Sequence, residues 1–170
     1  MQEKDKFMRV YDACADGIFR YCFFRVYDRE FARDLTQETF FRTWQAVSDG
    51  KKIDNLKAFA YRIARNLIID DSRKKKTMSL DKLILEDNMD FGIDEHLKIA
   101  GIIDGKLVLQ VLERLDDNYK EVVVMRYLDG LTPAEIAEIL GESPNAISIR
   151  INRGINRLRQ LLKDNGVNDL

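Results

Sequence analysis

Residues 131–163 read LTPAEIAEILGESPNAISIRINRGINRLRQLLK and contain two strong helix starts. The segment Thr132-Pro133-Ala134-Glu135 is a capping box with proline at the first helical position, and Ser143-Pro144 repeats the cap and the proline. Gly141, between the two starts, suits the end of the first helix. A short helix, a tight turn and a longer basic helix predict a helix-turn-helix.

The longer helix has two chemically different faces. At about 100° per residue, its apolar side chains gather in one sector, which contains Ile147, Ile151, Ile155, Leu158 and Leu162. Short amides and hydroxyls lie opposite, and three arginines follow one border. Amides suit base edges and arginines suit phosphates, so this face is expected to contact DNA. The residues of this expected site are Asn145, Ser148, Ile149, Arg150, Asn152, Arg153 and Arg157. A merely solvated face is the alternative, but exposed asparagines are unfavourable within a helix.

The composition is that of a globular helical protein. The chain has 170 residues, of which 45% are hydrophobic and 34% are charged, and its formal net charge is −1. The 9 glycines and 2 prolines are few for a β-sandwich with many turns. Cys14 and Cys22 lie without other metal-type residues nearby, so neither a disulfide framework nor a metal site is expected. We find no signal peptide and no long apolar run, and we expect a cytoplasmic protein.

The near-zero net charge conceals an uneven distribution. Residues 1–76 carry 17 basic and 12 acidic residues, whereas residues 77–107 carry 3 basic and 7 acidic ones. Residues 143–163 contain five basic residues and no acidic residue. Two separate basic faces on a neutral chain favour a polyanionic partner.

The periodicity predicts an all-α protein of two small helical domains joined by a flexible acidic linker. In the first domain, residues 1–76, three helices are expected at about 3–25, 28–47 and 55–76, with Asp54 or Asn55 capping the third. Their expected core consists of Phe7, Val10, Tyr11, Cys14, Ile18, Tyr21, Cys22, Phe31, Leu35, one of Phe40 and Phe41, Trp44, Val47, Leu56, Phe59, Ala60, Ile63 and Leu67. Residues 77–106 lack a period and form the linker. The helix-turn-helix domain occupies 107–170, where Asp129-Gly130 ends a helix that precedes the turn motif.

The helix-turn-helix region resembles part of a known family. Residues 109–163, and above all YKEVVVMRYLDGLTPAEIAEILG at 119–141, resemble the C-terminal domain of bacterial sigma factors, which binds the −35 promoter element. Response-regulator output domains share a similar pattern. Residues 34–44, DLTQETFFRTW, resemble the sigma helix that docks on the clamp helices of RNA polymerase. The resemblance implies that the polymerase-binding residues are Asp34, Gln37, Glu38, Arg42 and Gln45.

A third segment, NLKAFAYRIARNLIIDDSRKKK at 55–76, is similar to the sigma segment that opens the −10 element. Capture of a single strand needs a platform for a flipped base and cations for the phosphates. The implied residues are Asn55, Tyr61, Arg62, Arg65, Asn66, Arg73 and Lys74, and the loop at 48–54 would form a wall of a base pocket.

The order of the three motifs and the short region between the domains resemble the extracytoplasmic-function (ECF) sigma factors. The resemblance implies core RNA polymerase as partner, duplex −35 DNA, single-stranded −10 DNA and an anti-sigma factor that can hold the protein at the membrane. It implies no cofactor, no metal and no small-molecule substrate.

Two alternatives remain at this stage: a one-component helix-turn-helix regulator with a helical sensor domain, and a helical enzyme. An enzyme is not expected, because the one histidine, His96, has no nucleophile arrangement around it. The paired acids Asp70-Asp71 and Asp116-Asp117 are adjacent, so their side chains diverge on a helix.

Overall fold

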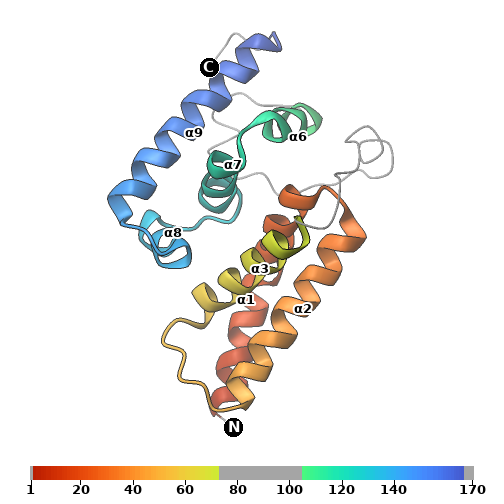
Figure 1. Ribbon diagram of the computed structural model, residues 1–170, viewed down its shortest axis with the longest axis vertical. Coiled ribbons are helices and arrows are strands. Elements are labelled where there is room, and N and C mark those ends of the chain that lie inside the picture. Colours follow the sequence, from red (N-terminus) through yellow and green to blue (C-terminus); the bar gives the residue numbers. More distant parts are fainter. Residues whose placement is uncertain (1, 73–104, 167–170) are drawn as a thin grey trace. The chain divides into compact units, whose positions relative to one another are not determined.

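The computed structural model describes residues 2–72 and 105–166, and within these ranges all regular structure is helical (Figure 1). The chain folds as two compact units, Met1–Met78 and Ser79–Leu170. The expected all-α class is therefore confirmed. The linker expected at 77–106 lies outside the described residues, apart from its last two positions.

The first unit is a three-helix assembly in which each helix packs against both others. Its helices are α1 (Gln2–Val26), α2 (Arg29–Ser48) and α3 (Leu56–Ser72), close to the three expected ranges. The core is rich in aromatic rings. It includes Ile18, Tyr21, Cys22, Phe24, Ala32, Leu35, Phe40, Ala60, Tyr61 and Ala64. Cys14 and Cys22 are buried and form no disulfide within the described residues.

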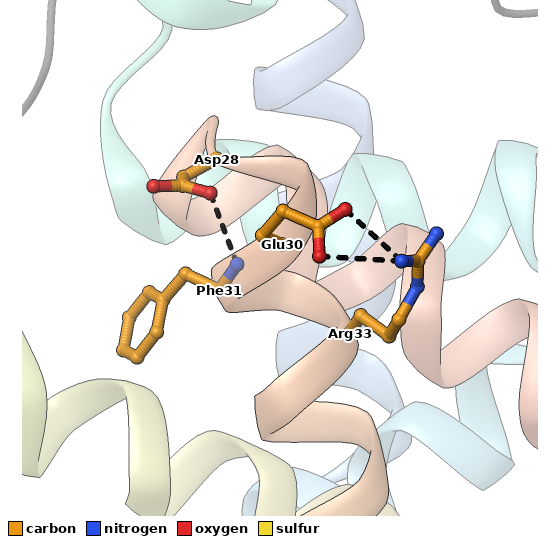
Figure 2. A network of polar contacts seen from close by, with 4 residues as sticks. All are labelled: Asp28, Glu30, Phe31 and Arg33. Carbon is orange, nitrogen blue, oxygen red and sulfur yellow. Dashed lines mark hydrogen bonds and ion pairs between the residues drawn. The ribbon is translucent and has the colours of Figure 1, made fainter.

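The chain reverses between α1 and α2 within two residues. Tyr27 adopts a left-handed backbone conformation, with φ of 51°. Asp28 is extended and caps α2, because its Oδ1 accepts a hydrogen bond of 3.0 Å from the backbone N–H of Phe31 (Figure 2). Glu30 lies in the first turn of α2, where its negative charge interacts favourably with the positive end of the helix dipole. It also forms an ion pair of 3.0 Å with Arg33. The corner is thus specified by residues next to one another in sequence.

The second unit is arranged around one long helix. It contains α6 (Gly105–Arg114), α7 (Asp117–Val123), the π-helical turn η1 (Val124–Leu128), α8 (Pro133–Leu140) and α9 (Pro144–Asp164). Helix α9 packs against α6, α7 and α8 (Figure 1). The apolar sector expected for α9 is the buried one, with Ile147, Ile151, Leu158 and Leu162 in the core and Ile155 half-buried.

The capping signals that predict the helix-turn-helix are present as hydrogen bonds. Thr132 Oγ1 accepts from the N–H of Glu135 at 3.2 Å, and Glu135 Oε2 accepts from the N–H of Thr132 at 2.8 Å. Ser143 Oγ accepts from the N–H of Ala146 at 3.1 Å. Gly141 has a left-handed φ of 71°, as the end of α8 requires.

The π-helical turn is not expected from the sequence. The mainly apolar stretch from Val122 to Leu128, interrupted by Arg126, has no periodicity that distinguishes an α-helix from a π-helical turn. In the structure, Asp129 donates its N–H to Val124 O at 3.1 Å, and Gly130 then takes a positive φ of 68°. Arg126 Nη1 donates to Leu131 O at 3.1 Å and joins the end of this turn to the start of the next segment.

Gly154 lies where α9 packs closely against α7. A Cβ at this position would lie 2.9 Å from Val123 Cγ2 and 3.3 Å from Tyr119 Cβ. Such distances require the two helices to move apart or their side chains to rearrange. The close approach therefore explains a glycine in a helix interior, where glycine is otherwise unfavourable by about 1 kcal/mol.

We expect Gly154→Ala to lower the free energy of unfolding of the second unit by about 1 kcal/mol. Overpacking costs about 1–3 kcal/mol, and the better helix propensity of alanine offsets part of it. Asn156→Ala, two residues along and exposed, is the matched control, which should leave stability unchanged or raise it. Urea unfolding of the full chain followed by circular dichroism measures both. A stabilising Gly154→Ala would contradict the steric explanation.

Candidate functional site

The polar side of α9 is accessible along most of its length. Asn145, Asn152, Arg153 and Arg157 are all exposed. Ile149 is an exposed apolar side chain at 44% of its accessible surface. The helix therefore has amides and arginines on one face while the other face is buried, as the sequence predicts. Amides and arginines on one accessible helix face can serve base edges and phosphates together.

Two residues of this face are already engaged within the protein. Ser148 is half-buried, and its hydroxyl donates to Pro144 O at 3.0 Å. Arg150 forms an ion pair with Glu142 in the turn between α8 and α9. Arg150 thus differs from Arg153 and Arg157 in being paired with an acid, and its expected contact with DNA stays a prediction. Sequence reasoning missed Glu142, because its carboxylate reaches Arg150 across eight positions and a turn.

The outer face of α2 carries the five residues that the resemblance implies for polymerase binding. Asp34 and Gln45 are exposed, as is Arg42, while Gln37 and Glu38 are at least partly accessible. Glu38 and Arg42 form an ion pair of 2.6 Å, with 42% and 52% of their side chains accessible. Because a helix turns about 100° per residue, these residues share one side of α2.

One aromatic residue of α2, Trp44, differs from expectation, whereas one phenylalanine of the Phe40–Phe41 pair is buried as expected. Trp44, expected in the core, is 37% exposed, although its ring lies 5.1 Å from that of Phe7. Phe40 is the buried member of the phenylalanine pair, and Phe41 is 63% exposed. On a helical projection, Phe41 lies about 20° from Asp34, at the centre of the polar face. The projection could have shown this from the sequence.

The same kind of difference appears in α1, where Tyr11 is also expected in the core. Tyr11 is 42% exposed, and its ring meets Phe40 at 4.7 Å in an edge-to-face arrangement. Rings of Phe7, Tyr11, Phe40 and Trp44 therefore form one aromatic layer between α1 and α2, of which the outer members remain accessible.

The residues of α3 that the resemblance implies for −10 binding differ in their exposure to solvent. Arg62 and Asn66 are exposed four residues apart, and Arg65 is half-buried. Asn55 caps the helix, because its Oδ1 accepts from the N–H of Ala58 at 3.0 Å. Arg73 and Lys74 lie outside the described residues.

The expectation that Tyr61 offers a platform for a flipped base is wrong. Its side chain is 1% exposed and packs edge-to-face on Tyr21, with ring centroids 5.8 Å apart. The cause is the set of small residues around it, since Ala60 and Ala64 allow α3 to approach its neighbours closely and bring Tyr61 into the core. Phe59, Ile63 and Leu67, expected on the core face, are instead half-buried.

The loop between α2 and α3 lines a hollow of about 310 Å³. Lys6 of α1 donates to Ile53 O at 3.2 Å and ties the loop to α1. The half-buried ring of Phe59 lies beneath the ammonium of Lys51, with Nζ 4.9 Å from its centroid. The hollow is lined by Glu3, Lys6, Val47, Gly50, Lys51, Lys52, Ile53, Asp54 and Leu56.

Within residues 2–72 and 105–166, no cluster of histidine, cysteine and acidic side chains could hold a metal ion. Among the helices described, none is long and apolar enough to span a membrane.

Family models match both units. The model for sigma-70 region 2 matches residues 10–77, and the model for sigma-70 region 4 matches residues 106–158. The first match includes α2 and α3, and the second includes the helix-turn-helix.

Similar proteins of known role cover nearly the whole chain. The RNA polymerase sigma factor SigZ of Bacillus subtilis is 32% identical over 157 residues, covering 91% of this chain and 85% of SigZ. The ECF sigma factor SigW of the same organism is 28% identical and covers 95% and 91%. BldN, an ECF sigma factor of Streptomyces coelicolor, is 31% identical over 95% of this chain, which spans only 62% of the length of BldN.

Solved structures share the fold. CnrH, in its complex with the cytosolic domain of CnrY, matches with a TM-score of 0.66 at 22% identity, covering 95% of this chain and 90% of CnrH. The Bartonella quintana sigma factor RpoE, in complex with the anti-sigma factor NepR, matches with a TM-score of 0.64 at 20% identity, covering 94% of this chain and 96% of RpoE.

The matches to sigma-70 region 2 on the three-helix unit and to sigma-70 region 4 on the helix-turn-helix unit identify a transcription initiation factor. The chain belongs to the RNA polymerase sigma factors, in their extracytoplasmic-function group.

The neighbouring rings Phe40 and Phe41 offer a matched test of the α2 orientation. We expect Phe40→Ala to cost about 3–5 kcal/mol of unfolding free energy, since it removes a buried ring. Phe41→Ala should change it by no more than about 0.5 kcal/mol. Trp44 is the chain's single tryptophan, so its fluorescence follows chemical unfolding of the first unit. Equal losses in the two variants would contradict the orientation described.

Proposed function

We propose that this sigma factor binds core RNA polymerase through the outer face of α2, single-stranded −10 DNA through α3 and the adjoining loop, and duplex −35 DNA through α9. The observation that carries the proposal is the division of α9 into a buried apolar face and an accessible face of amides and arginines. The protein acts by positioning polymerase and has no catalysis of its own. Its place of action is the cytoplasm, where polymerase and promoters meet.

The α2 face suits a protein partner. It combines both signs of charge with an exposed ring, Phe41, so that it can bury apolar area while its charges select the orientation. The ion pair of Glu38 and Arg42 is exposed, so it contributes little to folding and remains available to a partner.

We expect Glu38→Arg to weaken assembly with purified core RNA polymerase by roughly tenfold, because it reverses a charge in the middle of this face. Asp34→Arg, and Gln37→Ala combined with Arg42→Ala, should act in the same direction. The assay is a titration of labelled full-length chain with core polymerase, accompanied by circular dichroism to check helical content.

Arg33→Ala is the matched control for these variants. Arg33 is an exposed residue of α2 that pairs with Glu30 but lies about 100° away from Asp34 around the helix. It should assemble normally. Normal assembly of all the face variants would refute the assignment of α2.

The α3 region supplies what capture of a single strand needs, although not with the ring that the sequence suggests. Arg62 and Asn66 offer a cation and an amide side by side on the exposed side of α3. The hollow beneath the 48–54 loop, with Lys51, Lys52 and Lys6 on its lining, can receive a flipped base next to its phosphate. Tyr61 contributes to this site by supporting α3 from within the core.

The α9 face divides into base-reading and phosphate-binding residues. Asn145 and Asn152 carry amides that pair well with adenine in a major groove. Arg157, near the middle of the helix, is exposed and suits the backbone. Arg153 lies closest to the amides and can reach either.

We expect Asn152→Ala to relax preference at one base position, at a cost of about 1–3 kcal/mol against the best site. Arg157→Ala should weaken binding to all sequences similarly and lower the salt slope by about one unit. The measurement is a binding selection from randomised duplex, with the full chain assembled with core polymerase. A base-specific change for Arg157→Ala, or an unchanged profile for Asn152→Ala, would show that α9 docks in another rotation.

We also propose that an anti-sigma factor binds this chain. RpoE, whose fold is similar, is solved in complex with the anti-sigma factor NepR.

A further inference from the structure

The ion pair between Glu142 and Arg150 links the turn of the helix-turn-helix to the second turn of α9. Arg150 Nη2 donates to both carboxylate oxygens of Glu142. The two residues are eight positions apart, whereas the pairs Glu30–Arg33 and Glu38–Arg42 each lie within about one helical turn. The Glu142–Arg150 pair thus joins two segments whose relative placement forms the DNA-binding motif.

The backbone of Glu142 is held in place. Its N–H donates to Ala137 O at 3.0 Å, next to the bond from Gly141 N–H to the same oxygen at 2.8 Å. The following residue, Ser143, is fixed as the cap of α9. A carboxylate on a fixed turn confines its arginine far more than a carboxylate on a flexible segment does.

The pair is more shielded than the two ion pairs on α2. The side chains of Arg150 and Glu142 are 22% and 34% accessible, against 51% and 77% for Arg33 and Glu30. Arg153 and Arg157, on the same helix, are exposed and make no ion pair with any described residue. Arg159 is likewise exposed and makes no such ion pair, so Arg150 is the α9 arginine whose charge is cancelled by an acid among the described residues.

Cancelling one charge has a definite consequence for binding to DNA. Attraction to phosphates that is independent of sequence scales with the cations that replace counterions, so a neutral pair adds little to it. A confined guanidinium still offers the donors of its Nη1 and Nε, but only at one position. It can therefore form hydrogen bonds with DNA when the duplex is bound in one position. It cannot move to reach phosphates of a duplex that is bound in other positions.

We propose that Glu142 is a specificity-determining residue of the DNA interface, acting through Arg150. It lowers binding to arbitrary sequence and keeps Arg150 for the correctly seated duplex. The inference rests on the proposed binding of duplex DNA by α9. Because Glu142 also directly precedes the cap of α9, a purely stabilising role at the helix start is the competing explanation.

The test measures duplex binding at about 50–200 mM salt by the full chain assembled with core polymerase. The probes are the best duplex from a binding selection and a duplex of unrelated sequence. For Glu142→Gln we expect the salt slope on the unrelated duplex to steepen by about 0.9, which amounts to roughly threefold more loss of affinity across this range. The affinity ratio between the two duplexes should fall roughly threefold at about 50 mM salt.

Two further variants separate the mechanisms. In the Arg150→Gln background, Glu142→Gln should leave the salt slope unchanged, because the cation that it releases is absent. Glu113→Gln makes the same change of charge at an exposed site on α6 and should bind as the unaltered chain does.

An equal effect of Glu142→Gln with and without Arg150 would show direct repulsion of phosphate and overturn the inference. A loss of thermal stability with an unchanged slope would establish the stabilising role instead. If the unaltered chain selects no duplex sequence, the proposed function itself fails; normal selection with an unaffected Glu142→Gln variant refutes only the inference.

Discussion

The second unit depends on the burial of one face of α9 against three other helices. Because Ile147, Ile151, Leu158 and Leu162 are fixed in that core, the opposite side of the helix has no freedom to rotate. Gly154 adds a second restraint, since it allows the backbone of α9 to approach α7 at one point along its length. The outward orientation of Asn152 and Arg153 is thus a consequence of packing on the far side of the helix.

The parts of the fold that were predicted correctly are those whose causes are local. The caps at Thr132 and Ser143 and the glycine at 141 act through hydrogen bonds within a few residues, so their sequence signals are sufficient. The buried face of α9 was also predicted, because its apolar stripe is narrow and opposed by polar residues. In these segments the sequence pattern and the packing demand the same arrangement.

The predictions of buried residues failed where contacts with neighbouring helices determine which of several similar side chains is buried. Helix α3 has apolar side chains over a wide arc, and small alanines, which carry little weight in a hydrophobic pattern, decide which part of the arc faces inward. Tyr61 is buried and Phe59 is half-buried for that reason. In α2, the choice between Phe40 and Phe41 was left open, although a helical projection places Phe41 on the polar face. The pair Glu142–Arg150 escaped prediction because it depends on the turn geometry.

The structure shows which charges of α9 are neutralised by a neighbouring acid, and a count of charged residues does not show this. Residues 143–163 contain five cations and no acid, which suggests a uniformly basic helix. The acid that opposes them, Glu142, lies one residue before this segment and neutralises the cation nearest the helix start. The basic character of α9 is thereby concentrated from Arg153 onward, while the accessible residues of the first two turns include the amide of Asn145 and the apolar side chain of Ile149. A low net charge favours specificity in the part of a helix that contacts bases. Attraction to phosphates raises the affinity for every sequence and so reduces the ratio of specific to non-specific affinity. The nearly neutral chain as a whole follows the same principle, with attraction confined to the surfaces that use it.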